Sequence, residues 1–392
     1  VALDLHAVAQ RAAGGVGLAS DQFRPAVEPG RFRPRPPCFR HTNHSFPTVL
    51  PRTHLHHAPQ HHRAVRDGSV TSTPPHPVQR LTHCAMHPFR TPEKLATIDL
   101  HSGRRHSYAQ MHARVAGLAG HMLSLGIAQG DRVGLLAMNS SDFLDAMFAC
   151  WRIGAVCTTL NFRLTAHELA FMVKDSGCKL VFHDRDLASV VAPLQDMTSV
   201  DHWIEMDASG KRGAFEAAIA GATPIWKQVP QLESDLCMIM YSSGTTGTPK
   251  GVMFNHGQFF FINAGSMGMA GASAQMVGLV ALPLFHIGGL VAYTTITLGA
   301  GGTVVIERSF DAGRLLDTFD SAELGVTHFL GVPAMFNAMQ AHPRFATTDF
   351  SRMITTACGA ESVPEALLRT WYDRGVVIRE GYGMTETCAA CL

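Results

Sequence analysis

The sequence contains 392 residues, 46% of them hydrophobic and 16% charged, and its formal net charge is +1. This balance is typical of a globular protein with at least one large buried core, and the apolar runs stop well short of the roughly 20 residues that a membrane helix requires. The nine cysteines are odd in number and scattered, so we expect reduced thiols in a cytoplasmic protein rather than a disulfide framework.

The first 85 residues differ in composition from the rest. Residues 1–90 contain 11 arginines, no lysine and four acids, together with 11 of the 22 histidines and 12 of the 21 prolines. We predict that residues 1–85 are disordered. The five histidines between residues 54 and 62 suit a metal tract or a basic arm for nucleic acid. We favour instead a stretch translated outside its natural frame or start, or a dispensable tail, and we expect no nucleic-acid partner. Because the chain begins with Val1, we expect a fragment or a processed product.

From about residue 90, strand-like apolar runs alternate with helical periodicity. Ser107 and Gln110 predict a capping box at the start of a helix that Gly126 ends, and Thr165 with Glu168 predicts a second capping box. Around these helices we expect strands over residues 132–138, 155–160 and 179–183 and a further helix over residues 142–152. Two consecutive strand-helix units favour a mostly parallel sheet.

A looser stretch over residues 186–233 divides the globular part, residues 86–392, into subdomains of about 90–233 and 234–392. In the second subdomain, Ser362 is a predicted N-cap that Pro364 and Glu365 follow. Its strands are expected near residues 237–242, 277–284, 303–307, 326–332, 353–357 and 376–380. The predicted fold class is α/β, with two stacked α/β subdomains and mostly parallel sheets.

The stretch from Tyr241 to Gly251 reads Tyr-Ser-Ser-Gly-Thr-Thr-Gly-Thr-Pro-Lys-Gly and follows an apolar strand. Gly244 and Gly247 let backbone N–H groups approach an anion closely, while the neighbouring hydroxyls add donors and Lys250 adds a positive charge. This composition suits a polyphosphate. The P-loop pattern of Gly, four residues and Gly-Lys-Ser/Thr is not matched, so an ordinary P-loop ATPase is disfavoured.

Two further stretches follow this loop along the chain, Leu282-Pro-Leu-Phe-His-Ile-Gly-Gly289 and Gly381-Tyr-Gly-Met-Thr-Glu-Thr387. With these three motifs in this order, residues 90–391 resemble the adenylate-forming superfamily, and within it the acyl-CoA synthetase (AMP-dependent synthetase and ligase) family. The resemblance implies the large N-terminal domain of that family.

The resemblance also implies roles for individual residues. Lys250, His286 and Glu386 would be catalytic, with His286 beside the substrate carboxylate. Tyr382 would contact adenine, and Glu386 with Thr246 would hold Mg²⁺, which prefers oxygen ligands. The other implied nucleotide-binding residues are Ser242, Ser243, Gly244, Thr245, Thr246, Gly247, Thr248, Gly359, Ala360, Glu361, Gly381, Gly383, Met384 and Thr385.

Some residues depart from the family pattern or have a second interpretation. Cys358 lies where the family usually has glycine, so its side chain could narrow the pocket, although a cysteine is more commonly buried. Val332 and Pro333 resemble the pocket wall but also suit the core and a turn. Cys388 and Cys391 lack the partner pair of a zinc site, and we assign them no role.

The reaction that the resemblance implies has two steps. A carboxylate attacks the α-phosphorus of Mg-ATP to give an acyl-adenylate and pyrophosphate, and the thiol of CoA then displaces AMP. The neutral residues expected at the pocket favour a fatty or aryl acid over an amino acid. Two alternatives remain, namely an adenylating enzyme that loads a carrier protein and a non-catalytic fragment that binds nucleotide or acyl ligands.

Members of the family continue beyond the third motif. They have an aspartate that holds the ribose, a hinge, and a C-terminal lid domain that supplies a lysine. In this sequence no lysine follows Lys250. We therefore expect the 392-residue chain to lack the lid domain and to form thioester poorly or not at all.

Overall fold

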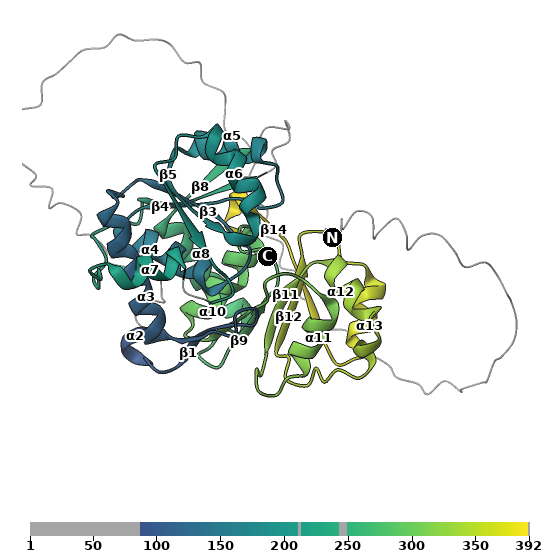
Figure 1. The fold of residues 1–392 in the computed structure, drawn as a ribbon. Helices are drawn as coiled ribbons and strands as arrows, with labels where there is room; N and C mark the ends of the chain where they lie inside the picture. The colour runs from purple at the N-terminus through teal and green to yellow at the C-terminus, as the bar shows by residue number, and fades with distance from the viewer. Residues whose placement is uncertain (1–86, 211–212, 243–248, 391–392) are drawn as a thin grey trace, which may run out of the picture. The chain divides into compact units, whose positions relative to one another are not determined.

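The computed structural model describes residues 87–210, 213–242 and 249–390, all of which belong to one compact unit, Pro74–Leu392. The predicted disordered segment 1–85, the loop residues 243–248 and Cys391 lie outside the described residues. Strands and helices alternate along the described part, as predicted, and two large β-sheets form its centre (Figure 1). Among the described helices, none combines the length and the apolar composition needed to cross a bilayer.

A seven-stranded sheet has the order β13-β12-β11-β9-β10-β1-β2, and its neighbours are parallel except for β1 and β2. These strands are β1 (Leu95–Asp99), β2 (Arg105–Ser107), β9 (Val277–Val280), β10 (Thr303–Ile306), β11 (His328–Gly331), β12 (Thr355–Gly359) and β13 (Ile378–Gly381). The residues of β10 are all buried, which is typical of a parallel strand covered on both faces.

A six-stranded sheet has the order β6-β5-β3-β4-β7-β8, and only β7 and β8 pair in the antiparallel sense. Its strands are β3 (Arg132–Leu136), β4 (Val156–Thr159), β5 (Cys178–Asp184), β6 (His202–Met206), β7 (Leu236–Ser242) and β8 (Lys250–Asn255). The mostly parallel pairing that the sequence predicts is confirmed in both sheets.

The two sheets do not follow the boundary expected near residue 233. The early strands β1 and β2 join the later strands β9 to β13, whereas β7 and β8 join the sheet of β3 to β6. The sheets therefore interleave along the chain. A hydrophobic period identifies a strand but carries no information about its distant pairing partner, which explains the difference.

The helix starts follow local capping chemistry. Both predicted capping boxes are confirmed, Ser107 with Gln110 before α3 (Tyr108–Ser124) and Thr165 with Glu168 before α5 (Ala166–Ser176). The prediction for α13 (Glu365–Tyr372) was wrong, because its N-cap is Pro364 and not Ser362. A proline disfavours the helical conformation of the residue before it, so Val363 is not suited to be the first residue of this helix, as an N-cap at Ser362 would require.

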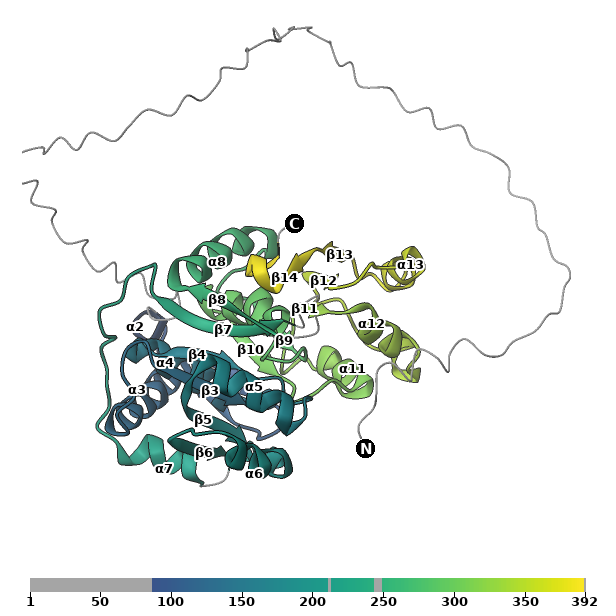
Figure 2. The ribbon, with the colours of Figure 1, turned by 90° about the horizontal axis from the view of Figure 1, so that it is seen from above.

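The remaining helices cover the sheets. Helices α11, α12 and α13 lie side by side next to β11 and β12 (Figure 1), and the hairpin of β14 (Gly383–Met384) and β15 (Ala389–Ala390) lies beside α8 (Figure 2). The other bounds are α2 (His87–Arg90), α4 (Ser141–Ile153), α6 (Ala188–Met197), α7 (Ala214–Gly221), α8 (His256–Ala270), α11 (Ala312–Asp320) and α12 (Pro333–Gln340).

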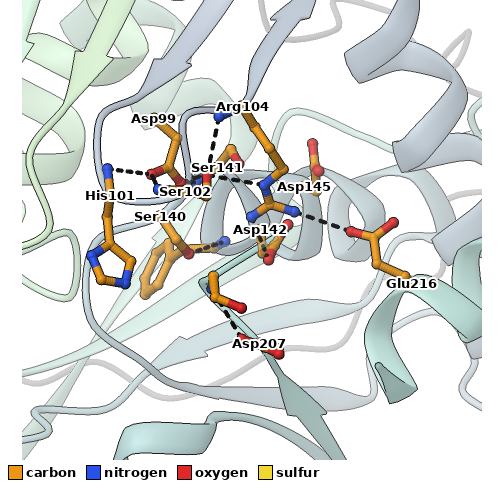
Figure 3. Close-up of polar contacts among 12 residues, drawn as sticks. Asp99, His101, Ser102, Arg104, Ser140, Ser141, Asp142, Asp145, Asp207 and Glu216 are labelled. Atoms are coloured by element: carbon orange, nitrogen blue, oxygen red, sulfur yellow. Dashed lines mark hydrogen bonds and ion pairs between the residues drawn. The ribbon is translucent and has the colours of Figure 1, made fainter. Parts of the chain in front are cut away.

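A network of charged side chains joins the elements of the two sheets. Arg104, from the β1–β2 turn, contacts Asp142 at 2.8 Å and Glu216 at 3.1 Å (Figure 3). Arg114, from α3, contacts Asp142 at 2.9 Å, Asp145 at 2.6 Å and Glu216 at 2.8 Å. The side chains of Asp142 and Asp145 are each only 1% exposed. Both arginines are therefore needed to compensate buried carboxylates.

Candidate active site

A cavity of about 980 Å³ lies where the parallel strands of the seven-stranded sheet end. Ligands of open α/β sheets bind outside the carboxyl ends of the strands, so this is the expected place for a site. The cavity is also bounded by α8 and by the β7–β8 hairpin. Its lining residues are Ser242, Lys250, Ser266, Met269, Ala270, Leu282, Pro283, His286, Ile287, Gly288, Ala292, Tyr293, Ile296, Leu330, Gly331, Val332, Thr355, Ala357, Gly359, Ala360, Arg379, Glu380, Gly381, Tyr382, Gly383, Met384, Thr385, Glu386 and Ala389.

The first motif connects two antiparallel strands. Ser242 ends β7 and Lys250 begins β8, and the two residues stand opposite each other in the hairpin. Both line the cavity, and Lys250 is exposed. The predicted phosphate-binding residues between them lie outside the described residues, so their roles stay predictions. These residues are Ser243, Gly244, Thr245, Thr246, Gly247 and Thr248.

The third motif meets the first one across the cavity. Glu386 lies on the 3₁₀ turn η5 (Thr385–Thr387), and its Oε1 accepts a hydrogen bond of 3.0 Å from the hydroxyl of Ser242. The two residues are 144 positions apart in the chain. Tyr382 lines the same cavity and is 59% exposed. Residues that the sequence predicts to bind one nucleotide are thus brought together.

The residues at this place suit a magnesium ion that arrives with phosphate. Glu386 offers a carboxylate, and Ser242 and Thr385 offer hydroxyl oxygens in the same cavity. Mg²⁺ is usually held by one or two carboxylates together with phosphate oxygens and water. Within the described part of the chain, no group of three or more His, Cys, Asp or Glu side chains could hold a metal ion.

The second motif continues into a helical segment, which the sequence reasoning did not predict. His286 is the N-cap of α9 (Ile287–Gly289), and the π-helix η3 (Leu290–Thr295) and α10 (Ile296–Gly299) follow directly. The backbone N–H of Gly288 donates to Nδ1 of His286 at 3.2 Å. Burial, and then the positive charge of Arg163, lower the pKa of His286 below 6.5. The imidazole is therefore neutral at pH 7, and the Gly288 bond assigns its proton to Nε2.

The strand β12 and the residues after it divide between the cavity and the core. Ala357, Gly359 and Ala360 line the cavity, whereas Glu361 does not. Cys358 points to the opposite side, where it is fully buried in the core. The alternation of side chains along a strand causes this arrangement, and the suggestion that Cys358 narrows the pocket was wrong.

Two further expectations at the cavity wall have opposite outcomes. Val332 lines the cavity. Pro333 does not line it; it is buried at the first position of α12, where a proline suits the helix start.

Ala360 has a φ of +72°, a left-handed conformation that costs an alanine on the order of 1 kcal/mol. Such strain occurs most often at binding sites.

Several lining residues were missed by the sequence reasoning. Ser266 and Met269 come from α8, Tyr293 from η3 and Arg379 from β13. One signal was present for Arg379, because it stands two residues before Gly381 in a strand and must share its face. No such signal existed for α8, whose sequence is apolar on nearly all sides.

Known proteins resemble this chain in sequence over the region that contains the cavity. Residues 85–392 match the family described as AMP-binding enzyme. A feruloyl-CoA synthase of an Amycolatopsis species is 36% identical over 300 residues, which are 76% of this chain and 58% of that protein. The long-chain-fatty-acid–CoA ligase FadD13 of Mycobacterium tuberculosis is 31% identical over 307 residues, again 76% of this chain and 58% of that protein. The chain thus spans less than two thirds of the length of these relatives.

Solved structures resemble the fold over the same region. The inhibitor-bound N-terminal domain of FACL13 from Mycobacterium tuberculosis has a TM-score of 0.72 and 30% identity, and the match covers 78% of this chain and 76% of that one. ATP-bound MatB from Rhodopseudomonas palustris has a TM-score of 0.71 and 28% identity, with 79% of this chain and 61% of that one covered. The α/β fold with two mostly parallel sheets is therefore shared with both.

Proposed function

This chain belongs to the AMP-binding enzyme family, and from that premise we propose that its cavity binds Mg-ATP and a carboxylic acid for ligation to the thiol of CoA. The relatives named above are acyl- or aryl-CoA ligases, which supports this reaction. The chain spans only 58% of the length of these relatives. Their complete reaction is therefore a proposal for this chain.

The observation that carries the proposal is the hydrogen bond between Ser242 and Glu386. It joins the phosphate-type loop to the Gly-Tyr-Gly motif across one cavity, so a single nucleotide can touch both. Lys250 and the loop would bind the β- and γ-phosphates, and Thr385 the α-phosphate. Glu386 would hold Mg²⁺, and Tyr382 would stack on adenine. The ion would supply charge neutralisation on the phosphate oxygens.

His286 would bind the acid. Its neutral imidazole carries a proton on Nε2 and can donate a hydrogen bond from there to a carboxylate oxygen. Because the imidazole has no positive charge, it does not lower the nucleophilicity of the carboxylate. The described residues around it are apolar on one side, with Leu282, Ile287 and Ala292 lining the cavity. An aryl or fatty chain suits such a wall better than an α-ammonium group.

The reaction depends on how the cavity positions the reactants, and no side chain of the protein has to act as a nucleophile. An oxygen of the carboxylate attacks the α-phosphorus, the bond to pyrophosphate breaks, and the acyl-adenylate remains. The thiol of CoA loses its proton to solvent, its sulfur attacks the acyl carbon, and AMP leaves with the electron pair of the broken carbon–oxygen bond. Holding the attacking oxygen in line and neutralising the phosphates are the effects that the residues of this cavity can supply.

Acid-dependent release of pyrophosphate tests this proposal. Purified protein is given Mg-ATP with ferulate or palmitate as the probe acid, and Glu386→Gln is compared with the wild type. Glu386→Gln should lower the rate roughly 100- to 1000-fold, as expected for loss of one electrostatic group. Glu365→Gln is the matched control, because Glu365 lies on the exposed face of α13 in a pair with Arg369. Equal rates of pyrophosphate release in Glu386→Gln and the wild type, or a wild type that binds neither Mg-ATP nor either acid, would contradict the proposal.

A further inference from the structure

The loop that leads to His286 is held by one buried amide side chain. Asn139 follows the end of β3 and is 2% exposed. Its Nδ2 donates to the backbone carbonyls of Leu282 at 2.9 Å and of Glu307 at 3.0 Å, and its Oδ1 accepts from the N–H of Leu284 at 2.8 Å. The amide therefore uses both its nitrogen and its oxygen on the backbone of this loop and of the segment after β10.

A threonine hydroxyl holds the same loop at the residue before His286. Thr159 is the last residue of β4 and is 2% exposed. Its hydroxyl donates to the backbone carbonyl of Phe285 at 2.9 Å. Because β3 and β4 pair with each other, Asn139 and Thr159 contact the loop from the ends of two neighbouring strands of the six-stranded sheet.

The backbone of the loop is packed too closely to shift independently of His286. The N–H of His286 donates to the carbonyl of Pro283 at 3.1 Å. A Cβ on Gly289 would lie 2.3 Å from that carbonyl oxygen and 2.8 Å from the carbonyl oxygen of Leu282. The start of α9 thus lies directly against the loop, and a displacement of the loop would move His286 with it.

The strand that carries Thr159 also pairs with the strand that leads to the phosphate side of the cavity. In the parallel pair of β4 and β7, Thr159 stands opposite Met240, and β7 ends shortly afterwards at Ser242. The hydroxyl of Ser242 donates to Glu386. A short series of covalent and hydrogen bonds therefore connects His286, which follows β9 of the seven-stranded sheet, with the opposite side of the cavity through the six-stranded sheet.

From these contacts we infer, resting on the proposed function, that Asn139 and Thr159 are positioning residues that set the distance between the acid at His286 and the phosphates at Ser242. The carboxylate oxygen has to be held in line with the α-phosphorus, and a misplacement of about 1 Å lowers the rate of such a step roughly 100-fold. Neither residue lines the cavity, so both act through His286. Loss of either side chain would leave buried backbone groups unpaired, which favours a displaced loop.

Calorimetric titration with two kinds of ligand tests the inference without depending on turnover. One ligand is AMP. The other is the sulfamoyl analogue of an acyl-adenylate, made with a feruloyl or a palmitoyl group, which joins acid and nucleotide and is not cleaved. Thr159→Val replaces the hydroxyl by a methyl group of similar size. It should weaken binding of the joined analogue roughly 3- to 10-fold, as expected for one hydrogen bond, and leave AMP binding unchanged.

Three further variants make the result specific. Thr159→Ser keeps the hydroxyl and should restore the affinity for the analogue. Thr97→Val removes a buried hydroxyl of β1 that has no hydrogen-bond partner among the described residues, and it should change neither affinity. Asn139→Ala removes three hydrogen bonds. It should weaken the analogue more than Thr159→Val does and also lower the melting temperature, so Thr159→Val decides the inference if the Asn139 variant does not fold.

The combination with His286→Ala distinguishes positioning from a general effect on the fold. If Thr159 acts through His286, Thr159→Val should add nothing to the loss of affinity that His286→Ala causes, because residues that act as one unit are not additive. A purely structural role of Thr159 would lower the affinity by the same factor with and without the imidazole.

The contrary outcomes separate the inference from the proposed function. Unchanged affinity for the analogue in Thr159→Val, equal weakening of the analogue and AMP, or equal effects in the presence and absence of His286 would overturn the inference. A wild type that binds AMP but holds neither analogue more tightly than AMP, or that binds none of these ligands, would defeat the proposed function itself.

Discussion

At the scale of single residues, Gly359 is constrained by its neighbour in the sheet. A Cβ on Gly359 would lie 2.4 Å from the backbone oxygen of Gly381, with which it pairs. Gly359→Ala should therefore push β12 and β13 apart and cost about 1–3 kcal/mol of unfolding free energy. Urea denaturation measures this change.

The pairing partner provides the control for stability. A Cβ on Gly381 would meet no atom within 4 Å, so Gly381→Ala should change the free energy of unfolding by less than about 1 kcal/mol. Equal destabilisation by both alanines would show that the close approach of the two strands is not the cause.

The motif residues could be predicted from the sequence, but other parts of the cavity could not. Five of the predicted residues that line it are Ser242, Lys250, His286, Tyr382 and Glu386. They could be predicted because local chemical requirements determine the composition of their motifs. Ser266, Met269 and Tyr293 lie in segments with no distinctive composition. Their place in the cavity depends on long-range packing, which a single sequence does not reveal.

At the scale of elements, the network around Arg114 holds α3, α4 and α7 together. Arg114→Met would leave the buried carboxylates of Asp142 and Asp145 with fewer partners. We expect a loss of about 3–5 kcal/mol in the free energy of unfolding, because an uncompensated buried charge is costly. Denaturant unfolding monitored by circular dichroism gives the value.

An exposed ion pair is the matched comparison. Arg369 and Glu365 are 76% and 75% exposed, so Arg369→Met should cost at most about 1 kcal/mol. If Arg114→Met were no more destabilising than Arg369→Met, the network would not contribute to the stability of these helices.

The ends of elements were predictable where local chemistry decides them. Ser107 and Thr165 begin helices as their capping boxes predict, whereas Ser362 does not, because Pro364 prevents the helix from starting there. Sheet membership was not predictable in the same way. The strands β7 and β8 have the apolar character of their neighbours, but their partners are set by contacts between distant parts of the chain.

At the scale of the whole described unit, one cavity combines parts of both sheets. The six-stranded sheet contributes Ser242 and Lys250 through its edge hairpin, and the seven-stranded sheet contributes Gly381 and the turn with Glu386. The central claim is that one ATP spans this cavity, with its terminal phosphates at Lys250 and its base at Tyr382.

The affinities of ATP and AMP for three proteins test this claim most directly. Calorimetric titration of Lys250→Ala should show ATP binding weakened roughly 10- to 100-fold, with AMP binding unchanged, because AMP lacks the β- and γ-phosphates that we propose Lys250 to bind. Tyr382→Ala should weaken both nucleotides by roughly 5- to 100-fold through lost stacking. Lys227→Ala, an exposed lysine outside the cavity, should change neither affinity. Unchanged ATP affinity in Lys250→Ala, or equal weakening of ATP and AMP by that substitution, would contradict the account.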